Sequence, residues 1–426
     1  MRKMKDSGVE WIGEIPADWE ICRFKNVAEL YTGNSIKDEE KEQYEDSVDA
    51  RPYIATKDID VTFGNVNYTN GLFVKLDDYS FKIAPRNSTL MCIEGGSAGR
   101  KKAKLSNDVA FVNKLCCFFS NKVDNTFLYY FLCSPNYEKE FTNNLSGLIG
   151  GVSVSVLKNI SFLLPPPEQQ RRIATYLDDK CAKIDDIIAR EQAVIEKLKS
   201  YKLSVVTEAV TKGLNPDVPM KDSGIDLCNK IPEQWTVSRI KYLFQLRDEK
   251  NYLPLEEVRL LSLYTEFGVF PHGEQDERGN KAVTADGYKA VYEKDIVVNI
   301  ILAWMGAIGV SSYDGVTSPA YDIYKPFSNV NSEFYHHLFR TKAFSAECYK
   351  YGRGIMAMRW RTYSTEFKSI FVPVPPVEEQ QQIVDYLDIK CTKIDSAIAK
   401  KQAAIDKLTE YKKSLIYEVV TGKKEV

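Results

Sequence analysis

The sequence predicts a mixed α/β protein with two globular domains joined by two long helices, which pair as an antiparallel coiled coil. The first observation behind this prediction is a long internal repeat: residues 165–211 align without a gap on residues 375–421, and about 26 of these 47 positions are identical. The second is a shorter repeat, in which residues 4–25 match residues 220–241. The third is that the intervening stretches do not match, so repeated and unrepeated parts alternate along the chain.

The repeats divide the 426 residues into four parts. Residues 1–164 form a globular domain that begins with the shorter repeated segment, and residues 165–213 form the first long helix. Residues 214–374 form the second domain, and residues 375–426 form the second helix. The order is cyclic, because the junction at residues 211–224 would be reproduced if the end of the chain met its beginning in space. Two such halves predict a pseudo-twofold internal repeat.

Each long helix follows a proline-rich stretch, and proline is tolerated in the first turn of a helix but not in its interior. Glu168 and Glu378 come next, and a carboxylate suits the positive end of the helix dipole. No helix breaker follows until Gly213 and Gly422. We therefore expect two helices of about 40 to 45 residues each.

Apolar side chains recur along both helices at the three- and four-residue spacing of a coiled coil. The predicted seam positions are Ile173, Leu177, Ile184, Ile187, Val194, Leu198, Tyr201 and Val205 in the first helix, and Ile383, Leu387, Ile394, Ala397, Ala404, Leu408, Tyr411 and Leu415 in the second. Glu191 and Lys401 hold corresponding seam positions, and their opposite charges favour pairing of the two helices. The alternative is that each helix packs on its own domain. As a pair, about 37 residues span roughly 55 Å, the length of about 16 base pairs of duplex DNA.

Composition narrows the class of protein. With 44% hydrophobic and 27% charged residues, the chain is predicted to be globular, and its formal net charge of −2 argues neither for nor against nucleic acid. The nine cysteines form no CxxC pair and the three histidines, His272, His336 and His337, lie near no cysteine cluster, so we expect no metal site. Scattered thiols fit a reducing compartment. No segment has the length of a membrane span or the apolar core of a secretory signal, so we expect a cytoplasmic protein without membrane contact.

Each unrepeated domain contains a cluster of cationic residues. In the first domain the cluster follows a glycine turn and consists of Arg100, Lys101, Lys102 and Lys104. In the second it lies at residues 349–363, where Lys350, Arg353, Arg359 and Arg361 alternate with Trp360 and three tyrosines. Arginine can donate two hydrogen bonds to guanine or to a phosphate, and aromatic rings pack on sugars and bases. The alternative is that each run is a solvated surface.

No set of residues predicts catalysis. The glycine-rich stretch at 94–100 has neither the spacing of a dinucleotide-binding fingerprint nor that of a phosphate-binding loop. Carboxylates beside a lysine, as at Glu39 and Asp248, occur often by chance in a chain this rich in charge. His336 and His337 are adjacent and point to different sides of a helix. Two other functions stay open at this point: an adaptor whose coiled coil joins two protein-binding modules, and a fused nuclease.

Two paired motifs connect the chain with a known family. An IP-x-x-W motif occurs at residues 15–19 and again at 231–235. The PP-x-E-x-Q helix starts lead into I-x-x-Y-L-D-x-K-x-x-K-I-D at residues 173–185 and 383–395. Over essentially its whole length, the chain resembles the DNA-specificity subunit of type I restriction-modification systems. The resemblance implies two target-recognition domains, each reading half of a bipartite, asymmetric DNA sequence, with the coiled coil setting the gap.

The resemblance also implies the partners. They are double-stranded DNA, two methyltransferase subunits that use S-adenosylmethionine, and restriction subunits with translocase and nuclease activity. S-adenosylmethionine, ATP and Mg²⁺ are implied only for those partners, and for this chain we expect no cofactor and no catalysis of its own.

Three kinds of loop are implied to contact DNA. They are the turn after a strand (residues 96–100 and 304–309), the loop before each long helix (145–155 and 352–361) and an early turn (32–37 with 53–59, and 260–269). The predicted DNA-contacting residues are Lys57, Ser97, Arg100, Lys101, Lys102, Lys104, Lys350, Arg353, Arg359, Trp360 and Arg361.

Overall fold

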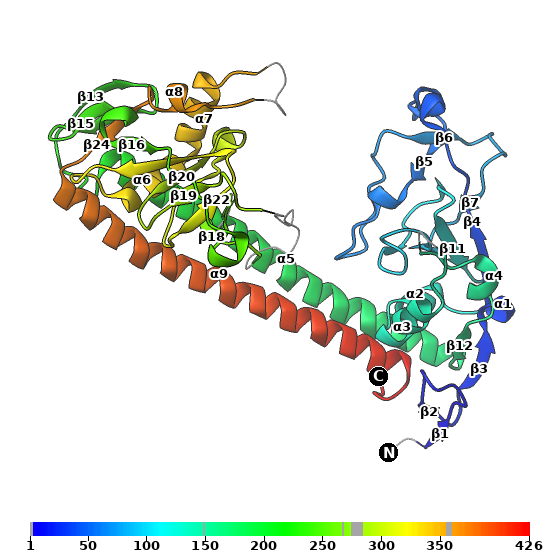
Figure 1. The fold of residues 1–426 in the computed structure, drawn as a ribbon. Helices are drawn as coiled ribbons and strands as arrows, with labels where there is room; N and C mark the ends of the chain where they lie inside the picture. Colours follow the sequence, from blue (N-terminus) through cyan, green and yellow to red (C-terminus); the bar gives the residue numbers. More distant parts are fainter. Residues whose placement is uncertain (1–2, 148–149, 266–267, 274–283, 355–359) are drawn as a thin grey trace. The chain divides into compact units, whose positions relative to one another are not determined.

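The computed structural model describes residues 3–147, 150–265, 268–273, 284–354 and 360–426 (Figure 1). The chain forms two compact units. Unit 1 consists of Met1–Ala193 with Lys401–Val426, and unit 2 consists of Val194–Lys400. Each unit therefore combines one globular domain with the adjoining parts of both long helices.

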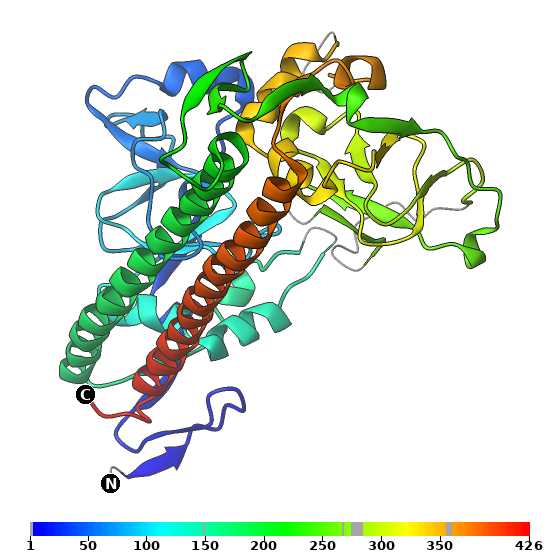
Figure 2. The same ribbon diagram turned by 90° about the vertical axis from the view of Figure 1, so that its left-hand side faces the viewer.

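The two long helices are α5 (Pro167–Lys212, 46 residues) and α9 (Val377–Val420, 44 residues). Within unit 1 they are antiparallel, because Asp185 pairs with Lys412 (Oδ2–Nζ 2.6 Å), whereas Glu191, further along α5, pairs with the earlier Lys401 (Oε2–Nζ 2.9 Å). The predicted pairing of opposite charges at residues 191 and 401 is confirmed. α5 and α9 lie side by side in both views (Figures 1 and 2).

The predicted seam register is wrong in the middle of α5, and in α9 the predicted Ala404 and Tyr411 are exposed whereas Ile405 is buried. The predicted positions Ile187, Val194 and Tyr201 are 45%, 37% and 48% exposed, whereas Ile188 and Ile195 are buried. Apolar residues stand next to each other at 187–188 and 194–195, so the sequence allows two registers. The structure uses the second of each pair: a step of four from Leu177 places the buried Cys181 on the seam and leads to Ile188 and Ile195, whereas the predicted step of three places the cation Lys180 there.

Unit 1 is built on two four-stranded sheets. The first has the order β4-β11-β8-β9 with all neighbours antiparallel, and the second has the order β6-β5-β10-β7, in which β5 and β10 are parallel. The strands of these sheets are β4 (Glu29–Thr32), β5 (Ala50–Ile54), β6 (Phe73–Lys75), β7 (Ile83–Ala84), β8 (Thr89–Cys92), β9 (Lys102–Lys104), β10 (Val109–Phe111) and β11 (Leu115–Phe119). β11 reads LCCFF and is buried on both faces, as a central strand must be.

Two small sheets and several short helices complete unit 1. The sheets pair β1 (Met4–Asp6) with β2 (Glu14–Pro16) and β3 (Glu20–Arg23) with β12 (Ser161–Leu164). The helices are α1 (Phe24–Val27), η1 (Asp38–Tyr44), η2 (Thr56–Asp58), α2 (Asn125–Leu132), α3 (Pro135–Asn143) and α4 (Val154–Leu157). Aromatic rings fill the core between them, among them Phe131 and Phe162 with centroids 4.8 Å apart.

Unit 2 repeats this strand order. Its main sheet is β16-β23-β20-β21, again with all neighbours antiparallel, and β15 pairs with β24 as β3 pairs with β12. β17 pairs with β18 and β19 with β22, and a parallel bridge between Leu260 and Val316 joins these two pairs. The strands are β13 (Met220–Ile225), β14 (Cys228–Pro232), β15 (Thr236–Arg239), β16 (Phe244–Arg247), β17 (Leu261–Tyr264), β18 (Gly268–Pro271), β19 (Lys289–Val291), β20 (Ile296–Asn299), β21 (Ile308–Val310), β22 (Gly315–Thr317), β23 (Tyr321–Pro326) and β24 (Phe371–Val374). The helices are η3 (Ile240–Tyr242), η4 (Leu255–Glu257), η5 (Ala303–Met305), α6 (Ser332–Phe339), α7 (Lys342–Tyr351) and α8 (Ser364–Phe367).

A buried glutamine joins each long helix to its domain in the same way. Gln170 accepts a hydrogen bond from the backbone N–H of Asp124 (2.9 Å), the residue that caps α2, and its amide donates to Pro165 O (2.7 Å). Gln380 accepts from the N–H of Asn331 (2.9 Å), which caps α6, and donates to Pro375 O (2.9 Å). The two domains thus meet their helices through one repeated contact, although their own sequences do not align.

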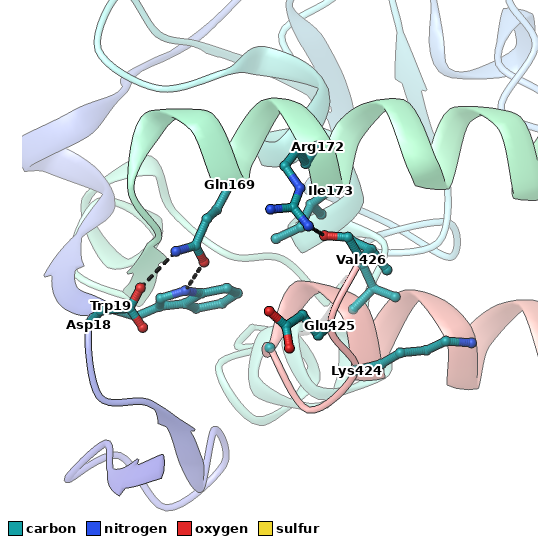
Figure 3. A pocket seen from close by; sticks show the side chains of 10 residues that line it. Asp18, Trp19, Gln169, Arg172, Ile173, Lys424, Glu425 and Val426 are labelled. Atoms are coloured by element: carbon teal, nitrogen blue, oxygen red, sulfur yellow. Dashed lines mark hydrogen bonds between the residues drawn. The ribbon is translucent and has the colours of Figure 1, made fainter. Parts of the chain in front are cut away.

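The end of the chain lies against its beginning in unit 1, as the cyclic order predicts. Trp19 donates its indole N–H to Gln169 Oε1 (2.8 Å), and Arg172 donates to Val426 O, at the edge of a cavity of about 330 Å³ (Figure 3). A Cβ placed on Gly422 would lie 2.4 Å from Pro16 Cγ. In unit 2 the equivalent Gly213 lies beside Pro232 and Trp235, so both junctions have the same neighbours.

Candidate nucleic-acid interface

Two of the predicted DNA-contacting loops of unit 1 are bonded to each other. The turn after β8 and the loop before α5 are joined by hydrogen bonds from Gly95 N to Gly150 O (2.9 Å) and from Val152 N to Ile93 O (2.9 Å). Together with the end of β4 they line a cavity of about 520 Å³. The polar side chains among its lining residues are Thr32, Glu94, Asn113, Ser146 and Ser153. The predicted loops therefore form one surface with a polar groove, which is referred to below as the unit 1 groove.

Cations lie at the end of the turn after β8 and on η2 next to it. Lys57 and Arg100 are exposed, and Lys101 is half-buried and donates to Thr56 O (2.8 Å), which places it next to Lys57. Ser97 accepts a hydrogen bond from Arg100 N through its carbonyl oxygen (3.1 Å) and so shapes the turn. These four predicted residues are close neighbours.

The other two predicted lysines of unit 1 have partners inside the unit. Lys102 is 6% exposed and donates to Glu138 Oε1 (2.6 Å) and Leu132 O (2.9 Å). Lys104 lies 3.3 Å from Asp178 Oδ2 on α5. Because a buried charge is costly to leave without its partner, Lys102 is held at Glu138 and its ammonium does not face solvent. DNA contact by either lysine stays a prediction.

Asp178 also joins α2 to α5. Tyr130 donates its phenol to Asp178 Oδ1 (2.8 Å), and burial raises the pKa of this tyrosine well above its usual range. The phenol therefore stays protonated and keeps its donor role. This contact and the one from Lys104 hold α2 and β9 on α5 within unit 1.

In unit 2 the turn after β20 is also joined to the loop before the long helix. Thr362 donates its backbone N–H to Ile300 O (2.8 Å), the counterpart of the bond from Val152 in unit 1. The early turn joins them, because Arg340 donates both to Ile308 O (3.2 Å) and to Thr265 O (2.7 Å). The three predicted loops are thus neighbours in this unit as well.

The predicted residues of unit 2 lie at the end of α7 and on the strand-like bridge that follows. Trp360 stacks on Tyr349 with centroids 4.8 Å apart, and Arg353 pairs with Arg361 through two backbone hydrogen bonds (2.8 and 2.9 Å). Both arginines are exposed, and Arg353 also forms an ion pair with Glu366 (2.6 Å). Arg359 lies outside the described residues.

Lys350 has an acidic partner near this bridge. It is exposed and donates to Asp226, and this hydrogen bond raises the pKa of Lys350 and lowers the pKa of Asp226. Lys350 therefore stays a cation at neutral pH, but it competes with its own carboxylate for any phosphate.

Several residues of these surfaces are absent from the predicted DNA-contacting residues, although Thr32 and Met305 lie on loops that the resemblance implied. In unit 1 they are Thr32, Glu94 and Asn113, which line the groove, and in unit 2 they are Leu302 and Met305, which are 37% and 54% exposed on the turn after β20. None of them belongs to a basic run. Their only signal is their position on corresponding turns, and the unrepeated parts of the sequence do not align well enough to show it.

The described residues give little support to a metal site, to a catalytic role of the adjacent histidines or to a membrane span. No group of three or more His, Cys, Asp or Glu side chains among them could hold a metal ion. His336 accepts a hydrogen bond from Val310 N (3.2 Å), and burial lowers the pKa of both His336 and His337, the latter to about 4. Both are therefore neutral at physiological pH. In the part of the chain that the structure describes, no helix is both long and apolar enough to cross a membrane.

The fold and the loops together define a class: a protein with two recognition domains of one topology, each presenting cations and polar side chains on three joined loops. Comparison with protein families identifies the class more closely. The model for the type I restriction modification DNA specificity domain matches residues 16–197 and again residues 232–407. The chain belongs to this family and carries two specificity domains, so it is a DNA specificity subunit of the type I restriction-modification kind, and the adaptor alternative falls away.

Full-length relatives agree. The chain is 24% identical to the type I restriction enzyme MjaVIII specificity subunit of Methanocaldococcus jannaschii, over 96% of this chain and 93% of that protein. It is 22% identical to the type I restriction enzyme EcoBI specificity subunit of Escherichia coli, over 99% of this chain and 89% of that protein. A chain in a solved structure of a type I restriction-modification system shares the fold with a TM-score of 0.68 at 13% identity, covering 96% of this chain and 99% of that chain.

Proposed function

We propose that each unit reads one half of a bipartite, asymmetric sequence in double-stranded DNA. The observation that carries this proposal is that one strand order and one glutamine contact occur twice, with different side chains on the corresponding turns. Two domains with the same strand order and different loops are suited to reading two different sequences. A symmetric target would need matching loops.

In this proposal, different residues provide the affinity for DNA and the preference for one DNA sequence. Exposed cations on the joined loops, such as Lys57, Arg100 and Arg361, neutralise phosphates and give binding that weakens steeply with salt. Side chains that reach base edges give the sequence preference. Lys102 stabilises the fold and does not contact DNA in this proposal, because its ammonium forms an ion pair with Glu138.

The helices α5 and α9 set the gap between the two half-sequences. α5 continues without interruption from unit 1 into unit 2, and ion pairs fix the register of the helices within each unit: Asp185 with Lys412 in unit 1 and Asp395 with Lys202 in unit 2. Asp185 corresponds to Asp395 and Lys202 corresponds to Lys412, each at an offset of 210 positions, so the same ion pair is formed twice. A helix pair locked in register is suited to fixing a distance.

The chain itself performs no chemistry in this proposal. It positions DNA for two methyltransferase subunits, which use S-adenosylmethionine, and for restriction subunits, which use ATP and Mg²⁺. The support is that the curated relatives are named as specificity subunits of restriction enzymes.

The test is a change in helix length. Seven residues inserted after Ile195 in α5 and after the equivalent Ile405 in α9 keep the seam and lengthen the pair by about 10.5 Å, or about three base pairs. Sequencing of modified adenines in cells that carry the variant and its methyltransferase partner should show a longer gap between two unchanged half-sequences. An unchanged gap would contradict the role of the helices.

Two controls separate length from damage. Insertion of seven residues in α5 alone leaves α9 short and should abolish modification. Insertion of four residues in both helices moves the seam out of register and should also abolish it. Wild-type modification of a single undivided sequence would contradict the bipartite reading itself.

A further inference from the structure

Glu94 is the one carboxylate among the lining residues of the unit 1 groove. Its backbone is held firmly at the point where β8 enters the turn. It forms a β-bridge with Gly151, and its carbonyl oxygen accepts a hydrogen bond from the thiol of Cys92 (3.3 Å). Because the next residue, Gly95, is bonded to Gly150, the main chain on both sides of Glu94 is fixed while the side chain is exposed.

The carboxylate of Glu94 has no partner in the described part of the chain. No hydrogen-bond donor reaches its oxygens there, and no Lys or Arg lies within ion-pair distance of it. Arg100, at the other end of the turn, donates to the carbonyl oxygen of Gly96. The two acceptor oxygens of Glu94 are thus available to a ligand in the groove.

A carboxylate at this place opposes DNA binding unless it has a specific use. Arg100 and Lys101, which follow Glu94 in the chain by six and seven residues, are suited to phosphate, whereas the negative charge of Glu94 is repelled by the DNA backbone. An acceptor-only group can, however, read a base that presents an amino group in the major groove, namely cytosine through N4 or adenine through N6. Guanine and thymine present only acceptors or a methyl group at the corresponding positions and repel it.

The other polar residues of the groove fit the same use. Asn113 is exposed, and an asparagine amide can bond both N6 and N7 of adenine. Thr32, Ser146 and Ser153 carry hydroxyls that donate and accept equally and add no charge. The groove therefore recognises hydrogen-bond patterns and has no cation of its own for a phosphate.

We propose that Glu94 determines the specificity of unit 1 at one base pair, by accepting a hydrogen bond from the exocyclic amino group of a cytosine or an adenine in the major groove. This inference rests on the proposed function, in which unit 1 reads one half of the target. It predicts two opposite effects of removing the charge. Discrimination at one base pair falls, and affinity for unrelated DNA rises.

The test uses Glu94→Ala and Glu94→Gln in the complex with the methyltransferase partner. Modified-adenine sequencing of the wild type first gives the target, and gel shifts then measure binding to duplexes in which each base pair of both halves is changed in turn. Glu94→Ala should lose about tenfold discrimination at one base pair of one half, as expected for one base contact, while its affinity for unrelated DNA rises. Glu94→Gln should retain most preference if the base is adenine, since glutamine pairs with both N6 and N7 of that base, and less if it is cytosine, where only the carbonyl oxygen can accept from N4.

Duplexes lacking a single amino group identify the contact directly. Purine in place of adenine removes N6, and 4-deoxy pyrimidine in place of cytosine removes N4. One such change should weaken wild-type binding about tenfold and leave Glu94→Ala binding unaffected. The matched control is Glu42→Gln, at an exposed glutamate of η1 that does not line the groove. It should behave as the wild type at every position.

The outcomes separate the two proposals. If the wild type shows a bipartite target and Glu94→Ala discriminates as the wild type does at every base pair, the role of Glu94 is wrong and the bipartite reading stands. A uniform loss of affinity, or a loss in both halves, also overturns the role of Glu94. If the wild type shows no bipartite target, the proposed function fails first.

Discussion

Units 1 and 2 have the same frame and different reading surfaces. Both have a four-stranded antiparallel sheet with the same strand order, and both hold their long helix through a buried glutamine. In both, the turn after β8 or β20 is hydrogen-bonded to the loop before the long helix. Yet that turn presents Glu94 in unit 1 and Met305 in unit 2. The repeated segments supply the same helix contact in both units, whereas the unrepeated segments keep one strand order and differ in the side chains on their turns.

The repeated tryptophans allow the sharpest test of this comparison. Trp19 and Trp235 are both fully buried, and both fill the junction between the shorter repeat and a long helix. Replacement of either by alanine should destabilise its own unit by about 3–5 kcal/mol, the usual cost of removing a large buried ring. Hydrogen exchange, followed separately in each unit, measures the loss.

Phenylalanine at the same positions should separate the two units. The Trp19 indole donates to Gln169 (2.8 Å), whereas the Trp235 indole N–H has no acceptor among the described residues. Trp19→Phe should therefore cost about 1 kcal/mol more than Trp235→Phe, because it breaks a hydrogen bond that the other replacement does not. Equal costs would mean that the two junctions are held alike.

The repeated ion pair between the helices is the second test. Asp185 with Lys412 in unit 1 is more buried than Asp395 with Lys202 in unit 2, since the side chains are 26% and 19% exposed in the first pair and 53% and 36% in the second. Asp185→Asn should destabilise by about 1–3 kcal/mol, as expected for a hydrogen bond to a charged group that is largely removed from water. Asp395→Asn should cost about 0.2–1 kcal/mol.

Thermal melts at low and high salt check this difference. Salt screens an exposed pair more than a buried one. The effect of Asp395→Asn should therefore shrink as salt is added, and that of Asp185→Asn should persist. The opposite ranking would place the firmer helix contact in unit 2.

Much of the architecture could be predicted from the sequence, because repetition signals it. The two long helices, their pairing and the opposite charges at 191 and 401 all follow from segments that recur with heptad spacing. The seam register could not be predicted in the middle of α5, where adjacent apolar residues such as Ile187 and Ile188 leave two choices. Only packing against α9 decides between them.

The reading surfaces were less predictable. Charge runs directed attention to residues 100–104, but β9 turns Lys102 toward Glu138 of α3, a partner that lies 36 positions away in the chain. Glu94 belongs to no run and becomes visible only when the turn after β8 and the loop before α5 are seen to line one groove. Side chains that converge from separate loops leave no local pattern in a single sequence.

The turn after β20 supplies a small expected effect on binding, and it completes the comparison with Glu94. Met305 and Leu302 are exposed on this turn, and exposed apolar side chains at a DNA surface can pack on the methyl group of thymine. Burial of one methyl group is worth about 0.8 kcal/mol, or roughly a fourfold change in affinity. Uracil in place of one thymine in the half read by unit 2 should weaken wild-type binding by about this factor and leave Met305→Ala unaffected. Met220→Ala, at an exposed methionine of β13, is the control and should remain sensitive to the methyl group. If Met305→Ala keeps the full preference for thymine over uracil at every position, the two turns do not have corresponding roles. The similarity of the two units is then limited to their strand order and their contacts with the long helices.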